Sequence, residues 1–179
     1  PTLRNKNKWF KPGFTWTTVS SGGFSARYCE EGALFDNGGC TLFSKDYLKI
    51  LGFFVNSKVA SRYFEFLSPT LNFQPGGTAA LPIQENLLSI DLDKNNNIRL
   101  SKKDWNSKET SWDFEENGLM KEAGTMKLEK AYGDYKKHWT EQFFQLHQNE
   151  EELNRQFIEI YGLQEELTPD VPLEEITIL

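Results

Sequence analysis

The spacing of hydrophobic residues predicts strands in the first quarter of the chain. Between Phe14 and Val19, aromatic and β-branched residues nearly alternate with polar ones, which is typical of a β-strand. Three shorter stretches are also predicted as strands: residues 25–30, 33–35 and 41–43. Three glycine doublets mark turns or close backbone approaches, at residues 22–23, 38–39 and 76–77.

Two helices are predicted next. Ser44 is a candidate N-cap for a helix over residues 45–52, and Asn56 or Ser57 for a second helix that ends at Leu67, before Pro69. The second helix places four apolar residues on one face, namely Val59, Tyr63, Phe66 and Leu67. Residues 79–82 and 83–90 are predicted to be extended.

The second half of the chain is predicted to be a polar connector followed by helices. Steps of three and four predict an amphipathic helix with an apolar stripe of Leu128, Tyr132, Tyr135, Trp139, Phe143 and Leu146. After Asn149 the pattern repeats as Leu153, Phe157, Ile160 and Tyr161, with Gly162 as C-cap, so we expect two helices packed together. The acidic tail over residues 163–179 should be extended and either docked or mobile.

These elements predict an α+β protein. A hydrophobic content of 38% and an aromatic content of 14% exclude a disordered chain. We expect a mixed strand and helix domain over residues 1–90, a polar connector over residues 91–117 and a helical segment with an acidic tail over residues 118–179.

The charge is unevenly distributed. The formal net charge is −6, which by itself argues against nucleic acid as a partner. From Pro1 to Phe64, however, there are nine Lys or Arg against four Asp or Glu, a net of +5, whereas the remainder has eleven against twenty-two, a net of −11. An anionic partner should therefore contact the first third.

Cysteine use and hydropathy predict a soluble, cytoplasmic protein. Cys29 and Cys40 have no second ligand pair nearby and are predicted to be free thiols. There is neither an apolar run long enough to span a membrane nor a signal peptide. Because the sequence starts at Pro1 without an initiator Met, we expect the natural polypeptide to extend upstream.

A calcium-like loop lies at residues 91–98. Asp91, Asp93 and Asn95 match the first three oxygen-ligand positions of an EF-hand loop. Asn96, however, replaces the turn glycine, and Lys102 replaces the closing Glu. The alternative is a polar loop whose Asp and Asn side chains stabilise turns.

No catalytic constellation is predicted. His138 and His147 are nine residues apart on a helical stretch and lack a serine or cysteine nucleophile motif. Asp113, Glu115 and Glu116 are as compatible with a solvated loop as with acid-base chemistry. The chain contains no phosphate-binding glycine motif. We therefore assign neither a catalytic residue nor a metal ligand.

Two glycine-containing segments could contact nucleic acid, at residues 20–28 and 69–77. Arg can read guanine through two hydrogen bonds, and Asn or Gln can read adenine in the same way. Glycine and serine let a loop approach phosphates with its backbone amides. An ordinary glycine-rich hairpin over a core explains the composition equally well.

Five segments together resemble a known family. They are similar, in order, to the C-terminal target-recognition region of PglX-type adenine-specific DNA methyltransferases. The segments are residues 20–28 (SSGGFSARY), 51–59 (LGFFVNSKV), 68–74 (SPTLNFQ), 104–114 (DWNSKETSWDF), and 149–155 with 160–163 (NEEELNR, IYGL). These enzymes belong to BREX phage-exclusion systems and are related to type IIG restriction-modification enzymes.

This resemblance implies a large enzyme that binds S-adenosylmethionine, flips an adenine out of duplex DNA and methylates its exocyclic amine. The family's catalytic Asn-Pro-Pro-Tyr tetrad is absent, because no two prolines in this chain are adjacent. The resemblance therefore implies a DNA target-recognition fragment over residues 1–90 that lacks the catalytic domain. Its partners would be double-stranded DNA and the catalytic domain of the same polypeptide.

The predicted DNA contacts lie in the first half of the chain. Base or loop contacts are expected from Ser21, Gly22, Gly23, Arg27, Tyr28, Asn72 and Gln74, and phosphate attraction from Lys6, Lys8 and Lys11. The alternative is a protein-interaction module. In that case the aromatic helical stripe and the acidic tail would bind other phage-defence subunits, without DNA contact.

Overall fold

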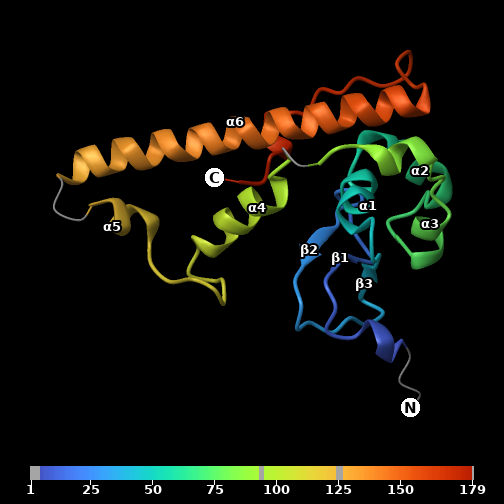
Figure 1. The fold of residues 1–179 in the computed structure, drawn as a ribbon, viewed down its shortest axis with the longest axis horizontal. Helices are drawn as coiled ribbons and strands as arrows, with labels where there is room; N and C mark the ends of the chain where they lie inside the picture. The colour runs from blue at the N-terminus through green and yellow to red at the C-terminus, as the bar shows by residue number, and fades with distance from the viewer. Residues whose placement is uncertain (1–4, 93–94, 124–126, 179) are drawn as a thin grey trace. The chain divides into compact units, whose positions relative to one another are not determined.

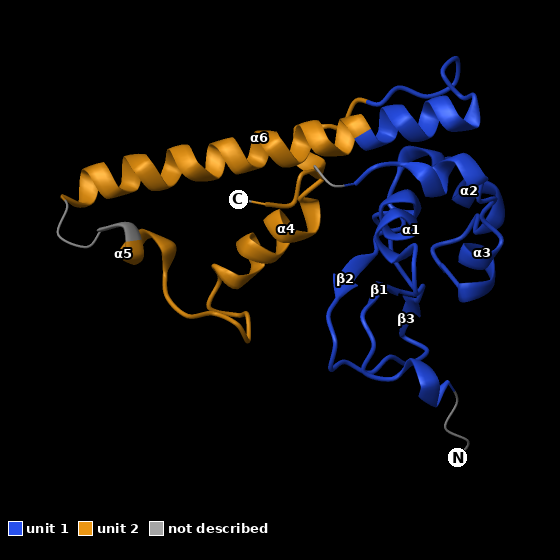
Figure 2. Cartoon of the chain, in the orientation of Figure 1, with its two compact units in different colours: residues 1–92, 153–169 blue, residues 93–152, 170–179 orange. Residues whose placement is uncertain are grey.

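The computed structural model describes residues 5–92, 95–123 and 127–178. The chain divides into two compact units, coloured separately in Figure 2. The first unit contains residues 1–92 and 153–169, and the second contains residues 93–152 and 170–179. The chain thus leaves the first unit after residue 92, returns to it at residue 153 and enters the second unit again at residue 170.

The elements of the first unit precede those of the second along the chain, apart from the last helix (Figure 1). The first unit contains the 3-10 turn η1 (Lys6–Lys8), strands β1 (Gly13–Thr17), β2 (Arg27–Cys29) and β3 (Gly39–Leu42), helices α1 (Leu48–Val55), α2 (Lys58–Leu67) and α3 (Pro75–Ala79), and the 3-10 turn η2 (Glu85–Ser89). The second contains α4 (Asn97–Asn106), α5 (Gly118–Ala123) and the 3-10 turn η3 (Leu173–Glu175). Helix α6 (Leu128–Tyr161) contributes to both units.

An antiparallel sheet of order β2-β1-β3 forms one layer of the first unit. Side chains alternate between the two faces of a strand, and Phe14 and Trp16 of β1 are buried on the same face. Helix α1 contacts β1 on this face: a Cβ added to Gly52 would lie 2.1 Å from the Phe14 ring. A small sheet with helices confirms the α+β fold class.

The C-terminal end of α6 completes the core of the first unit. Phe157 and Phe54 are fully buried, with ring centroids 5.7 Å apart, and the Tyr161 ring stacks on Phe54 at 5.3 Å. The buried Asn154 accepts a hydrogen bond from the Lys58 amide at 3.0 Å. Since the first amides of a helix lack intrahelical partners, Asn154 supplies one at the start of α2.

The second unit is held together by the chain's tail. A buried apolar cluster joins α4, α6 and the tail through Leu100, Leu146, Val171, Ile176 and Ile178. Two polar contacts fix Val171. Its carbonyl oxygen lies 2.8 Å from His147 Nε2, and its amide donates to the Glu151 carboxylate at 3.1 Å. The part of the tail from Asp170 to Ile178 is therefore docked in this unit, one of the two alternatives predicted from the sequence.

Several helix ends predicted from the sequence are confirmed. Ser57 caps α2, with its hydroxyl accepting from the Ala60 amide at 3.2 Å. Gly162 ends α6 with φ of 67°, and the amides of Gly162 and Leu163 donate to the carbonyls of Glu159 and Ile158. This is a Schellman-type ending, in which a left-handed glycine satisfies the last carbonyl groups.

Other predicted elements are wrong. Residues 128–161 form one helix of 34 residues instead of two. The polar stretch around Asn149 does not break it, because glutamates are good helix formers and the Asn149 amide donates outward to Asn96 and Asn97 at 3.0 and 2.8 Å. Residues 79–90, predicted to be extended, contain the end of α3 and η2, and residues 33–35 are not a strand.

The apolar face predicted for the second helix is also partly wrong. Phe66 is 72% exposed, whereas Phe64 is buried. The stripe of α6 is likewise buried only in part, since Leu128 and Tyr132 are 63% and 56% exposed while Trp139 and Leu146 are buried. Which apolar residues are buried therefore depends on where a neighbouring element packs.

Replacing Phe157 with alanine should test whether the end of α6 belongs to the core of the first unit. Because the ring is fully buried against Phe54, we expect Phe157→Ala to lower the free energy of unfolding by about 3–5 kcal/mol. Phe144→Ala, on the same helix at 48% exposure, is the matched control and should cost less than about 1 kcal/mol. Urea unfolding followed by circular dichroism measures both, and equal losses would contradict the packing.

Glu150 should make the stability of the second unit depend on pH. Burial raises the pKa of this half-buried carboxyl to about 7; the nearby His147 lowers it and Glu175 raises it. The folded state therefore binds a proton more tightly than the unfolded chain, so this contribution to stability is complete below about pH 4.5 and is lost as pH rises through 7.

Glu150→Gln should remove that pH dependence. At pH 8 we expect the free energy of unfolding of the variant to exceed that of the wild type by about 1–2 kcal/mol, a value reduced for the partial exposure of the carboxyl. At pH 4.5 the variant should be no more stable than the wild type. Urea titrations at the two pH values measure the difference. Glu141→Gln, which removes an exposed carboxylate from the same helix, should leave the wild-type pH profile unchanged. Parallel profiles for wild type and Glu150→Gln would refute the expectation.

Candidate nucleic-acid interface

The predicted DNA-contact residues all belong to the first unit, where the structure sorts them into separate groups. Ser21, Gly22 and Gly23 form an exposed loop after the end of β1. Asn72 and Gln74 are also exposed, between α2 and α3. The other predicted residues lie on β2 or before β1.

A single antiparallel bridge, called the ribbon below, joins the chain just before the Ser21–Gly23 loop to the segment around Asn72. Val19 and Asn72 form an antiparallel bridge, flanked by hydrogen bonds from the Ser20 amide to the Leu71 carbonyl at 2.9 Å and from the Phe73 amide to the Thr18 carbonyl at 2.6 Å. Two segments distant in the sequence therefore form one local surface.

An aromatic cluster fixes this ribbon to the body of the first unit. The indole Nε1 of Trp16 donates to the Phe73 carbonyl at 2.9 Å. The rings of Phe24 and Phe64 stack at 4.5 Å, and the Phe73 ring meets each of them edge-on at 5.5 Å. The cluster therefore connects the ribbon residue Phe73 to β1, to α2 and to Phe24, which follows the loop.

The amide side chains of Asn72 and Gln74 are coupled. Gln74 Nε2 donates to Asn72 Oδ1 at 2.8 Å. The backbone of Gln74 is held as the N-cap of α3, where its carbonyl accepts from the amides of Gly77 and Thr78 at 3.0 and 3.3 Å. The exposed side-chain amides of Asn72 and Gln74 therefore lie on backbone that is held by the ribbon at Asn72 and by the start of α3 at Gln74.

Arg27 and Tyr28 point to opposite faces of the sheet. Tyr28 is opposite Phe14, and the two rings meet edge-on at 5.6 Å on the face that α1 covers. Arg27 is opposite Thr15 and is exposed, so it belongs to the other face. Tyr28 therefore packs beside the core, while Arg27 is accessible from solvent.

The three predicted phosphate-contacting lysines lie at the start of β1. Lys6 and Lys8 are in η1, and Lys11 follows them; Lys8 Nζ lies 5.8 Å from the centre of the Phe43 ring. The Ser21–Gly23 loop follows the other end of β1, a strand of five residues that spans about 17 Å. The structure therefore does not bring these lysines next to the loop.

Asn56 holds Ala26, the residue before Arg27, a role that the sequence analysis missed. Its Oδ1 accepts from the Ala26 amide at 2.8 Å, and its Nδ2 donates to the carbonyls of Ala26 and Gly52 at 2.9 and 3.0 Å. The side chain thus ties the residue before β2 to the end of α1. The available signal was an asparagine directly before the N-cap serine, which we interpreted only as a possible cap.

The asparagines of the calcium-like loop are used in hydrogen bonds. Asn95 Oδ1 accepts from the Asn97 amide at 3.1 Å, and Asn96 and Asn97 both accept from Asn149. Asp93 of the motif lies outside the described residues. Among the residues that the structure describes, no group of three or more His, Cys, Asp or Glu is placed to hold a metal ion.

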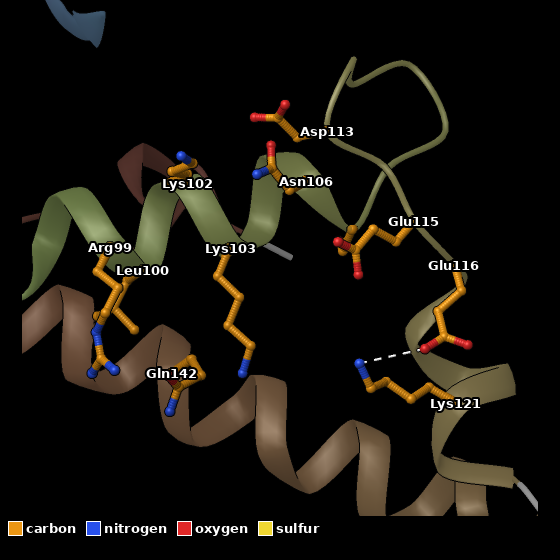
Figure 3. A pocket seen from close by; sticks show the side chains of 11 residues that line it. Arg99, Leu100, Lys102, Lys103, Asn106, Asp113, Glu115, Glu116, Lys121 and Gln142 are labelled. Carbon is orange, nitrogen blue, oxygen red and sulfur yellow. Dashed lines mark ion pairs between the residues drawn. The ribbon is translucent and has the colours of Figure 1, made fainter. Parts of the chain in front are cut away.

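The second unit has an open hollow of mixed charge, shown in Figure 3. Arg99 and Lys103 extend from α4 toward α6, and Lys103 Nζ lies 2.6 Å from His138 Nε2. On the other side, Lys121 and Glu116 form an ion pair at 3.4 Å. Because both signs of charge line the hollow, its electrostatics favour no single class of ligand.

The described cysteines are free, and the described helices are unlike membrane spans. Cys40 is buried in β3, and burial raises the pKa of its thiol, with a further increase from Asp36. Cys29 lies on β2. None of the helices in the described ranges combines the length and apolar character needed to cross a bilayer.

Removing the Asn56 amide should loosen β2 at Arg27. Because the side chain makes three hydrogen bonds to backbone groups, Asn56→Ala should lower the free energy of unfolding by about 1–2 kcal/mol. Hydrogen exchange measured by NMR should show the Ala26 amide losing protection. Asn37→Ala, an exposed asparagine between β2 and β3, is the control and should preserve that protection. Unchanged exchange at Ala26 in Asn56→Ala would exclude the positioning role.

Sequence comparisons identify relatives along nearly the whole chain. The chain is 38% identical over 177 residues to the adenine-specific methyltransferase PglX of Lacticaseibacillus casei (strain Zhang), and this match covers 94% of the chain and 15% of PglX. It is also 38% identical over 175 residues to the adenine-specific methyltransferase BrxX of Escherichia coli O9:H4 (strain HS), covering 96% of the chain and 14% of BrxX. No family model matches the chain. The chain is thus related to a segment of the PglX and BrxX adenine-specific methyltransferases and spans about 15% of their length.

Proposed function

We propose that this chain is the DNA target-recognition part of an adenine-specific DNA methyltransferase of a phage-exclusion or restriction-modification system. The observation that carries the proposal is the exposed ribbon at Val19 and Asn72, with its glycine loop, in a chain related to such methyltransferases. A two-stranded β-ribbon fits the major groove of DNA, where base edges can be read, and the Val19–Asn72 bridge supplies one residue pair of such an arrangement.

In this proposal the chemical step is performed by another part of the enzyme. That part would bind S-adenosylmethionine, and the target adenine would leave the helix because its amine is inaccessible inside the duplex. This chain would supply binding and orientation. We assign to it neither a cofactor site nor a catalytic residue, and its intramolecular partner would be the catalytic domain.

The basic residues of the first unit would attract the DNA backbone. Arg27 is exposed on the open face of the sheet, while the Ser21–Gly23 loop can approach phosphates through its amides. Lys6, Lys8 and Lys11 lie before β1, whereas the loop follows the other end of this strand. The lysines would therefore contact phosphates away from the bases that the ribbon reads.

A second candidate function is binding of another protein subunit through α6. Leu128, Tyr132 and Phe144 are large apolar residues of this helix that are 48–63% exposed. Exposed large apolar side chains are typical of surfaces that bind another protein. The acidic tail is a weaker candidate for such a surface, because Val171, Ile176 and Ile178 are buried in the second unit.

Salt dependence distinguishes the two functions. Lys6→Gln, Lys8→Gln and Lys11→Gln combined should weaken duplex binding and reduce the slope of log Kobs against log salt by up to about 2.7, since each lost phosphate contact removes about 0.9. Fluorescence anisotropy with a labelled duplex measures this. Lys130→Gln, Lys136→Gln and Lys137→Gln on α6 are the matched control, with the same loss of charge, and should leave the slope unchanged. If the wild-type chain binds no duplex at low salt, the DNA-recognition proposal is wrong.

A further inference from the structure

The exposed face of the Val19–Asn72 ribbon pairs an apolar side chain with a hydrogen-bonding one. The flanking hydrogen bonds lie at residues 18–73 and 20–71, so Val19 and Asn72 form the non-hydrogen-bonded type of antiparallel pair. In such a pair the Cα atoms are only about 4.5 Å apart, and both side chains point to the same face. Val19 is 67% exposed, and Asn72 is exposed as well.

On the opposite face of the ribbon Phe73 is buried, whereas Leu71 is 59% exposed, so Phe73 alone anchors this face. Phe73, the neighbour of Asn72, is buried in the aromatic cluster with Phe24 and Phe64. The hydrogen bond from Trp16 to the Phe73 carbonyl holds the same residue from β1. Because side chains alternate along a strand, burial of Phe73 directs Asn72 to solvent.

Gln74 restrains the orientation of the Asn72 amide. Its side-chain hydrogen bond to Asn72 uses one edge of the amide, and an amide oxygen has two lone pairs. If both amide groups were rotated by 180°, Asn72 would donate to Gln74 instead. In the structure Asn72 keeps both N–H groups and one oxygen lone pair; after the rotation it would keep one N–H and both lone pairs, so a donor and an acceptor remain in either arrangement.

Those two groups match one DNA base. In the major groove adenine presents the N7 acceptor beside the N6 amine donor, whereas guanine presents two acceptors and cytosine one donor. The thymine that pairs with adenine presents its C5-methyl group in the same groove. An amide next to an exposed valine is therefore complementary to an adenine·thymine pair.

We propose that Asn72 reads an adenine in the DNA target, that Gln74 is the positioning residue for its amide, and that Val19 contacts a thymine methyl group beside it. This inference rests on the proposed DNA-recognition function and deepens it by naming the base. The ribbon enters the major groove with Asn72 and Val19 toward the base edges. The Ser21–Gly23 loop, which continues from the ribbon, approaches the backbone.

The first experiment identifies the preferred sequence. The wild-type chain is incubated at about 50 mM salt with duplexes of randomised sequence, and the bound duplexes are sequenced. We expect enrichment of a site containing an invariant adenine·thymine pair. Absence of any duplex binding would refute the proposed function itself. Binding without such a pair would leave DNA binding intact and overturn the present inference.

The second experiment changes the amide pair. On the enriched site, Asn72→Ala should reduce the preference for adenine over guanine at one position by about five- to hundredfold. Asn72→Asp, which can only accept, should shift the preference at that position toward cytosine. Gln74→Leu should reduce the same preference while leaving salt dependence unchanged. Asn37→Ala is the control with no expected effect, and equal base preference in all variants would overturn the inference.

The third experiment changes single atoms of the DNA. Replacing the adenine with 7-deazaadenine removes N7 and should weaken binding by the wild type but not by Asn72→Ala. Replacing the thymine with deoxyuridine removes only the methyl group and should weaken wild-type binding about fourfold, with no effect on Val19→Ala. If each DNA change weakens binding equally in the wild type and in the matching variant, the proposed contacts of Asn72 and Val19 are wrong. Because the three residues are exposed, melting curves should confirm that all variants remain folded.

Discussion

The packing of Phe73 into the aromatic cluster of Trp16, Phe24 and Phe64 is the constraint on which the candidate interface depends. It joins the end of β1 to a segment beyond α2, and it buries Phe73 while the neighbouring Asn72 stays exposed. Burial of one phenyl side chain typically stabilises a fold by about 1.5–3 kcal/mol. A surface presented on such a cluster is preorganised, so little ordering would be needed when it binds a rigid partner.

Helix α6 gives the chain its division into two units. Its last turns bury Phe157 and cap α2 through Asn154, whereas its middle buries Leu146 against α4 and the tail. The tail follows the same division, because residues 163–169 belong to the first unit and Val171 begins the segment docked in the second. Glu150 and His147 lie where the tail meets the helix, so titratable groups take part in this docking.

Local signals in the sequence were sufficient for much of the secondary structure. The Ser57 cap and the Gly162 ending were predictable because each depends on hydrogen bonds within a few residues. The single helix through Asn149 was not, because its side chain is satisfied by Asn96 and Asn97 more than 50 residues away. Phe64 and Phe66 are both apolar neighbours on α2, and only the position of Phe73 and Phe24 decides which one is buried.

The sequence by itself determined the α+β class, the basic first third, the resemblance to adenine-specific methyltransferases and the list of residues suited to DNA contact. Composition, periodicity and similarity are properties of the chain alone. The tertiary structure decided which of those residues share a surface. It joined the Ser21–Gly23 loop to the segment of Asn72, and it placed the three lysines at the other end of β1 from this loop. It also placed Arg27 and Tyr28 on opposite faces of the sheet. Pairing between distant segments depends on packing and register, which no local pattern of residues specifies.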